Sequence, residues 1–151
     1  ILIIPIMALL LRSIRLFLVS LLPNLLPMLA ALAFMAAAGI SVRIGTAMIL
    51  AIALGIAIDD TIHLMSHLRK HNAEGGHPKE IVWRTLAQTG KAILYTLGGL
   101  VYGFGGMLSN ELMAIRDMGI VAAVTIIIAL IADLYLAPAL YLLSFGVLKK
   151  D

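Results

Sequence analysis

The chain consists largely of long apolar stretches separated by short polar segments, and this alternation limits how it can fold. A helix that crosses a bilayer needs about 20 mostly apolar residues. We therefore predict an all-α fold, a polytopic transmembrane helix bundle with about five spans. The expected spans cover residues 16–38, 45–66, 92–108 and 118–145, after a shorter apolar run at residues 1–11 that we interpret as the end of a truncated span.

Composition excludes the soluble classes of protein. Of the 151 residues, 62% are apolar and 13% are charged, whereas soluble domains average about 45–50% and about 25%. A chain this short cannot bury so much apolar surface against itself, because small domains bury only part of their surface. The net charge of +3 is not concentrated in a basic stripe, so we expect no nucleic-acid partner. The absence of cysteine excludes disulfides and thiolate metal sites.

Residues 68–91 form a polar connector between the third and fourth expected spans. Within it, Pro78 favours the start of a short helix lying on the membrane surface, and Gly90 is expected to end that helix. Trp83 suits the headgroup region, where aromatic side chains gather. The connector is therefore expected to lie at the membrane surface.

Basic residues predict the orientation of the chain in the membrane. Five spans place nine Lys and Arg residues on one side, and only Arg43 and Arg116 on the other. Cytoplasmic loops carry an excess of Lys and Arg in membrane proteins. We therefore expect the connector and the C-terminus to be cytoplasmic.

Two adjacent carboxyl groups, Asp59 and Asp60, lie inside the third expected span. At about 1.5 Å per residue, Asp59 lies about 20 Å along this span, in the cytoplasmic half of the hydrocarbon. A charge there costs at least about 2.5–3.5 kcal/mol, and no Lys or Arg lies within a span to pair with it. Burial without a cationic partner favours the neutral acid, so we expect this pair to load and unload protons. The alternative is a structural pair that finds partners or reaches the cytoplasmic surface.

The residues around this pair form a regular helix face. Ala51, Gly55, Asp59, His63 and His67 recur every four residues and so lie on one side of a helix. The small side chains at Ala51 and Gly55 would let another helix approach closely. Such a helix would bring a hydrogen-bonding group to Asp59.

His63, His67 and His71 also recur every four residues, a spacing that can hold a metal ion. The metalloprotease pattern requires Glu directly after the first His, and Leu64 stands there instead. We therefore expect no metal and no other cofactor. His63 is a weaker candidate for the proton path, and its alternative is a hydrogen-bonded structural role.

Two further groups of residues stand out in the last two spans. Gly99 and Gly103 have the spacing of a close-packing motif, and Thr96 can hydrogen-bond either a neighbouring carboxyl or its own helix backbone. Asp133, which precedes Pro138 in the last span, either braces the bundle or joins a proton path. No arrangement typical of a nucleophilic or glycosidic enzyme is present, so we expect no catalysis.

Four motifs carry a family resemblance when taken in chain order. They are Leu11-Arg12-Ser13-Ile14-Arg15, Leu22-Pro23-Asn24-Leu25-Leu26-Pro27, Gly55-Ile56-Ala57-Ile58-Asp59-Asp60-Thr61-Ile62-His63, and Ala132-Asp133-Leu134 with Pro138-Ala139-Leu140. Together they resemble the resistance-nodulation-division (RND) superfamily of proton-driven exporters, in the branch of MMPL-type, sterol-sensing-like and hopanoid-type transporters. The resemblance covers essentially the whole chain.

The resemblance implies a larger parent protein in the bacterial inner membrane. Members have twelve spans in two repeated halves, and this chain is similar to the last five spans of one half, with features that favour the C-terminal half. It implies that Asp59 and Asp60 relay protons, with Thr96 as the assisting residue. The implied partners are membrane lipids, the other half, the extracytoplasmic domains and a lipid or other hydrophobic cargo. A homo-oligomer is a further expectation.

Two alternatives to an exporter remain open from the residues. A non-transporting, sterol-sensing-like module that binds lipid or serves assembly would share the spans without requiring a titrating carboxyl. An intramembrane metal-dependent enzyme would use Asp59, Asp60 and His63, but its ligand motif is incomplete. The exporter is the interpretation that uses the carboxyl pair most directly.

Overall fold

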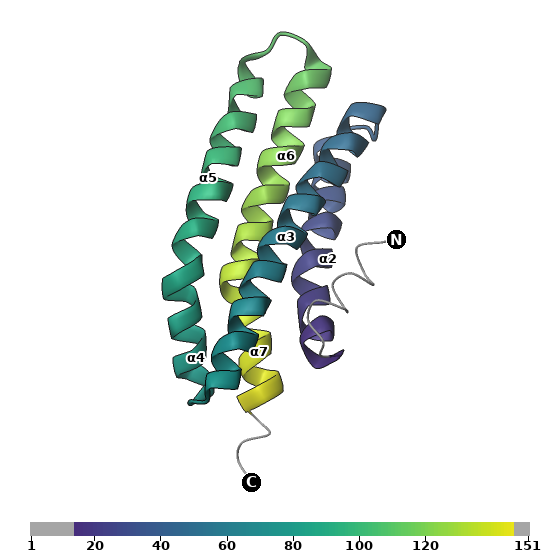
Figure 1. Cartoon of the computed structure of the whole chain (residues 1–151). Coiled ribbons are helices and arrows are strands. Elements are labelled where there is room, and N and C mark those ends of the chain that lie inside the picture. The colour runs from purple at the N-terminus through teal and green to yellow at the C-terminus, as the bar shows by residue number, and fades with distance from the viewer. Residues whose placement is uncertain (1–13, 147–151) are drawn as a thin grey trace.

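The computed structural model describes residues 14–146, and the side chains of residues 20–144 (Figure 1). These residues form helices and no strand, which confirms the predicted all-α fold. The expected truncated span at residues 1–11 lies outside the described residues. Four helical segments of the described chain are long and apolar enough to cross a membrane: Ser20–Ala38, Ile44–Glu74, Pro78–Ser109 and Met113–Ser144.

Each of the last two segments consists of several helical elements that follow one another with no non-helical residue between them. The described elements are α2 (Ile14–Ala38), α3 (Ile44–Glu74), α4 (Pro78–Thr85), the π-helical η1 (Leu86–Gly90), α5 (Lys91–Gly105), the 3-10 helical η2 (Gly106–Ser109), α6 (Met113–Ile131), the π-helical η3 (Ala132–Leu136) and α7 (Ala137–Gly146).

Glycines and one threonine determine where the helices end at the connections between α2 and α3 and between α3 and α4. Gly39, at the end of α2, has φ of 70°, a left-handed conformation that glycine adopts without strain. Thr46 then starts α3, because its hydroxyl accepts a hydrogen bond from the Arg43 backbone N–H at 2.8 Å. Gly75 and Gly76, with φ of 84° and 135°, reverse the chain between α3 and α4.

The polar connector is more helical than its sequence predicts. α3 continues to Glu74, and the helix that begins at Pro78 does not end at Gly90, so that expectation was wrong. Gly90 has φ of −61° and ψ of −35°, which is ordinary right-handed helix. The π-helical turn of η1 carries the backbone from α4 directly into α5, so a separate surface helix is not formed.

Pro138 accounts for the second π-helical turn. A proline nitrogen has no hydrogen, so Pro138 cannot donate to the carbonyl four residues before it. The backbone N–H of Ala137 instead donates to the carbonyl of Ala132, five residues earlier. The helix thus passes from α6 through η3 into α7, and Asp133 lies in the widened turn.

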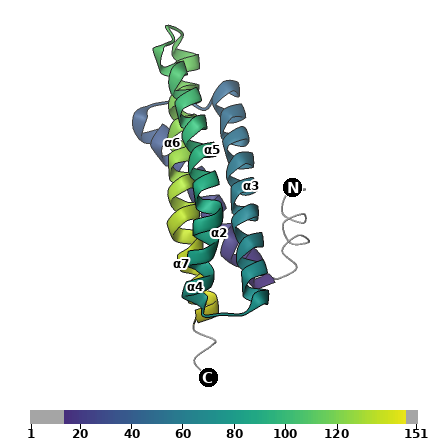
Figure 2. The same cartoon turned by 60° about the vertical axis from the view of Figure 1, so that its left-hand side comes forward.

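α6 is the central helix of the bundle. It contacts α2, α3 and α5, and α2 also contacts α3 (Figures 1 and 2). The turn between α5 and α6 lies at one end of the molecule, while α4 and α7 lie together at the other (Figure 1). The bundle is therefore a set of long antiparallel helices arranged around α6.

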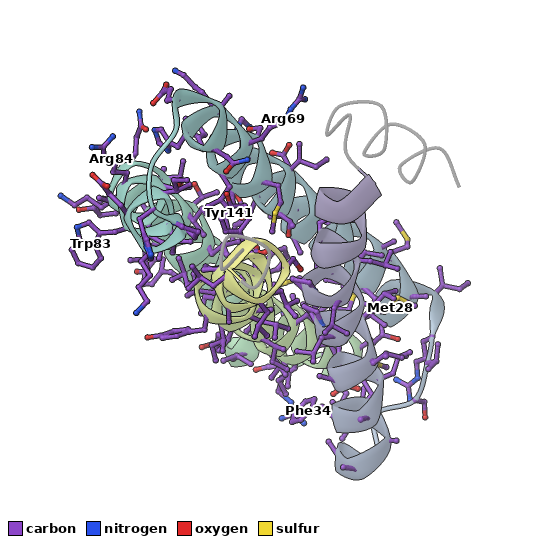
Figure 3. The ribbon with its side chains drawn as sticks, turned by 90° about the horizontal axis from the view of Figure 1, so that it is seen from below. Met28, Phe34, Arg69, Trp83, Arg84 and Tyr141 are labelled. Atoms are coloured by element: carbon purple, nitrogen blue, oxygen red, sulfur yellow. The ribbon has the colours of Figure 1, made fainter. Side chains whose placement is uncertain are left out.

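A buried apolar cluster lies where α3, α4 and α7 come together. Leu64, Met65, Ile81 and Tyr141 are at most 3% exposed there. Figure 3 shows Tyr141 among the helices of the bundle, whereas Trp83 projects outward from α4. Many large apolar side chains elsewhere face outward, as expected for helices that contact lipid rather than water. Examples are Leu29, Ile44, Tyr95, Tyr102 and Leu143.

Candidate functional site

An open groove runs between α3 and α5 at the level of the carboxyl pair. α3 contributes Asp59 and Asp60 to its wall, and α5 contributes Thr96 and Gly99. The groove has a volume of about 620 Å³, and the other residues that line it are Gly55, Ile56 and Leu100. Residues more than 35 positions apart in the sequence therefore meet at one site.

The two carboxyls of the pair have different surroundings. Asp59 is exposed on the outer side of α3, whereas Asp60 is partly buried. The Oδ2 atom of Asp60 is buried and forms no hydrogen bond with the described residues. Adjacent residues point about 100° apart on a helix, so Asp59 faces outward while Asp60 turns toward the interior of the bundle. Asp60 thus links the groove to that interior.

Thr96 lies in the groove, but its hydroxyl serves its own helix. Thr96 Oγ1 donates to the carbonyl oxygen of Ala92 at 3.0 Å, and the side chain is exposed. Of the two roles open to Thr96, the structure shows the hydrogen bond to its own backbone.

A substitution of Thr96 tests whether that bond matters. Thr96→Val is expected to change the free energy of unfolding by no more than about 0.5 kcal/mol, because an exposed hydroxyl is removed. Thr61→Val is expected to cost about 1–3 kcal/mol, because buried acceptors would lose their partner. Unfolding of both variants in mixed micelles with increasing dodecyl sulfate compares them. Equal losses would show that Thr96 has a structural partner outside the described residues.

The glycines predicted to allow close helix packing lie against open space. At Gly55, Gly99 and Gly103, no heavy atom of the described chain, apart from the glycine's chain neighbours and its own helix backbone, lies within 4 Å of the position that a Cβ would take. Ala51 is also exposed. Close approaches among the described residues are found at Gly119 of α6, beside the end of α5, and at Gly45 of α3, beside Met118. The predicted packing role of the α3 and α5 glycines is therefore not met by any described helix.

A second polar site lies inside the bundle, where α2, α3 and η3 meet. Thr61 Oγ1 lies 2.6 Å from Asp133 Oδ1 and 3.1 Å from Asn24 Oδ1. These three side chains are 0%, 1% and 5% exposed. Thr61 thus connects η3 to α3 and α2, while the other oxygen of Asp133 forms no hydrogen bond with the described residues. The bracing role and the proton path both remain predictions for Asp133.

Thr61 and Asn24 were not predicted as site residues. The available signals were an amide within an apolar span and a hydroxyl directly after the carboxyl pair. Neither signal names a partner, because threonine in a helix usually bonds its own backbone, as Thr125 does at 2.6 Å from the Val121 carbonyl oxygen.

The three histidines of the i, i+4, i+8 series differ in exposure, and the rings of His67 and His71 lie 6.2 Å apart. His63 is exposed on α3, and His67 is partly buried. His71 Nδ1 lies 2.9 Å from Thr85 Oγ1, which also lies 2.8 Å from the Ile81 carbonyl oxygen. His71 thereby ties the end of α3 to α4. His63 remains a prediction for the proton path.

Comparison with protein-family models matches the MMPL family over residues 1–147. The chain belongs to the MMPL family. A similar protein from Streptomyces coelicolor, SCO6666, is named only as a membrane protein and is 29% identical over 93 residues. The match covers 62% of this chain and 13% of that protein. The present MMPL chain is thus an apolar helical membrane module with carboxyls at two sites, in the groove and inside the bundle.

Proposed function

We propose that this MMPL chain is the membrane portion of an exporter driven by the proton-motive force, and that Asp59 and Asp60 relay the protons. The expected cargo is a lipid or another hydrophobic compound. The observation that carries the proposal is the carboxyl pair on the wall of an open groove, within an apolar helix whose described neighbours offer no Lys or Arg at that level. No structural contact of the described chain requires Asp59 there.

The surroundings of the pair support proton exchange. A carboxyl that faces lipid or packed apolar groups is favoured in its neutral form, whereas an ionised one requires water or a polar partner. Asp59, at the outer side of α3, can meet a proton donor, and Asp60 carries the charge change toward the interior. A neutral carboxyl lets apolar groups pack over the groove, whereas an ionised one requires water or a polar group there. Each proton gained or lost thereby changes what can cover the groove.

The glycines of the groove support a moving partner. Gly55 and Gly99 present bare backbone on facing helices, and no described atom occupies the space beside either. Small residues let helix backbones approach closely in membranes. A further helix, from the missing part of the transporter, is the expected occupant, and its contact with Asp59 would depend on the protonation state.

Proton flux through the full-length protein tests the proposal. The protein is reconstituted into vesicles that contain pyranine, a pH gradient is imposed, and flux is recorded with and without an NBD-labelled phospholipid. Asp59→Asn and Asp60→Asn are each expected to reduce flux to the level of protein-free vesicles, because an amide cannot carry the proton. Glu80→Gln is the matched control, since Glu80 is an exposed acid paired with Arg84 on α4.

Each result has a definite meaning. Loss of flux in both carboxamide variants, with protein still inserted and monodisperse, supports the relay. Wild-type flux in both variants contradicts it and favours the lipid-binding or assembly module. A flux that the labelled phospholipid does not alter excludes that phospholipid as cargo.

A further inference from the structure

The site inside the bundle, formed by Asn24, Thr61 and Asp133, contains more acceptors than one hydroxyl can serve. Thr61 Oγ1 lies within hydrogen-bonding distance of three oxygen atoms: Ala57 O at 3.0 Å, Asn24 Oδ1 at 3.1 Å and Asp133 Oδ1 at 2.6 Å. A threonine hydroxyl has a single hydrogen. At most one of these three oxygens can therefore accept it at a time.

The orientation of the Asn24 amide is set by a second contact. Asn24 Nδ2 donates to the carbonyl oxygen of Ser20 at 2.7 Å. The opposite orientation would place Oδ1 against that carbonyl, acceptor against acceptor. Asn24 therefore presents an acceptor to Thr61, and a bond between them requires the Thr61 hydrogen.

The short contact between Thr61 and Asp133 has two chemically distinct forms. If Asp133 is ionised, it can only accept, so the Thr61 hydrogen is directed to Asp133 and Asn24 Oδ1 loses its donor. If Asp133 is protonated, its own O–H donates to Thr61 Oγ1, and the Thr61 hydrogen is free to bond Asn24 Oδ1 or Ala57 O. The proton enters and leaves at Asp133, while the hydroxyl hydrogen only rotates.

We propose that these three residues form a proton-responsive switch in which protonation of Asp133 turns the Thr61 hydroxyl from η3 to α2. The side-chain bond between α2 and α3 then exists only while Asp133 is neutral. This is a second site of proton binding, separate from the groove. The inference deepens the proposed function and relies on it for the source of the proton.

The charged and titratable groups around the switch favour coupling to the groove. Asp60 stands one residue before Thr61 on α3, so it is the nearest carboxyl to Thr61 along that helix. Tyr141 is buried on α7, next to η3. The described side chains of α2 include no titratable group, and those of α6 lie at its far end. A negative charge on Asp60 therefore opposes one on Asp133, so loading or emptying the groove carboxyl biases the switch.

The geometry of the chain supports a mechanical effect. Asp133 lies in the π-helical turn η3, and π-helical turns inside α-helices are frequent at functional sites. η3 contacts α2, α3, α6 and α7. A hydrogen bond gained or lost at Asn24 thus changes how α2, on the outside of the bundle, is held to α3.

Infrared difference spectroscopy of the full-length protein in lipid tests the switch without requiring transport. Spectra are recorded over a range of pH with aspartate labelled in its carboxyl group. We expect a protonated-carboxyl band that appears as pH falls, is lost in Asp133→Asn and shifts in Thr61→Val, because the acid then lacks its acceptor. Thr61→Ser is expected to restore the wild-type band position.

Thr125→Val is the matched control, since Thr125 is a buried hydroxyl that serves only its own helix among the described contacts. The inference is overturned if no band is lost in Asp133→Asn, if that band is present at every pH, or if Thr61→Val leaves it unshifted. Its failure is distinguishable from that of the proposed function, because flux through Asp59 and Asp60 is measured separately.

Discussion

Tyr141→Ala is expected to lower the free energy of unfolding by about 3–5 kcal/mol, the range seen when a large aromatic side chain is removed from a core. Tyr141 is 0% exposed and is among the largest fully buried side chains of the described chain. It belongs to the buried apolar cluster of α3, α4 and α7 that also contains Leu64 and Ile81. In a bilayer, helices associate largely by close packing, so a cavity at this position loses contacts that lipid cannot replace.

Equilibrium unfolding in mixed micelles with increasing dodecyl sulfate measures this effect. Tyr102→Ala is the matched control, because Tyr102 on α5 is 87% exposed. We expect the control to change stability by no more than about 0.5 kcal/mol. A similar loss in both variants would mean that Tyr102 is covered in the full-length protein. A small loss in Tyr141→Ala would contradict the packing described at this end of the bundle.

Gly119→Val is the second substitution with a large expected effect. A Cβ at Gly119 would lie 2.7 Å from the Met107 Cβ and 2.8 Å from the Phe104 carbonyl oxygen. One of these atoms belongs to the backbone, so a side-chain rotation cannot relieve the clash. Overpacking of this kind costs about 1–3 kcal/mol and occasionally more. We expect Gly119→Val to separate the end of α5 from α6.

Thermal unfolding in detergent, followed by the loss of monodisperse protein, detects this separation. Gly98→Val is the control, because no described atom lies within 4 Å of a Cβ at Gly98. Gly45→Val gives a useful intermediate case, since its clash is with the Met118 sulfur at 2.7 Å, near the end of a flexible side chain. We expect Gly98→Val to be the most stable of the three variants, Gly45→Val to be intermediate and Gly119→Val to be the least stable. Wild-type stability of Gly119→Val would contradict the close contact between the helices.

The local sequence patterns predicted where the helices lie better than they predicted where one helix ends and the next begins. The apolar stretches marked each helix that the structure describes as long enough to cross a membrane. Gly90 was expected to stop a helix, yet it lies within one. Glycine is only mildly unfavourable inside a helix, at about 1 kcal/mol, and Gly90 is buried beside η3, where a Cβ would lie 3.7 Å from the Leu134 side chain. The propensity of one glycine therefore does not fix where this helix ends.

The groove was predictable only in part. Asp59 and Asp60 stood out because charge within an apolar stretch is costly, and Thr96 was placed near them by resemblance. The structure brings all three to one groove but directs the Thr96 hydroxyl to Ala92. Which group a hydroxyl bonds depends on how far apart two helices lie and how each is rotated about its axis. The spacing of residues along one helix does not predict either quantity.

The sequence by itself determined the class of this protein and the position of its costly charges. Bilayer thickness imposes a length on every apolar stretch, and a carboxyl inside such a stretch is conspicuous without any knowledge of its neighbours. Only the tertiary structure decided which polar groups meet. Thr61 finds Asn24 at 37 residues' separation and Asp133 at 72, because the rotation of three packed helices, and not any local pattern, turns those side chains toward one point.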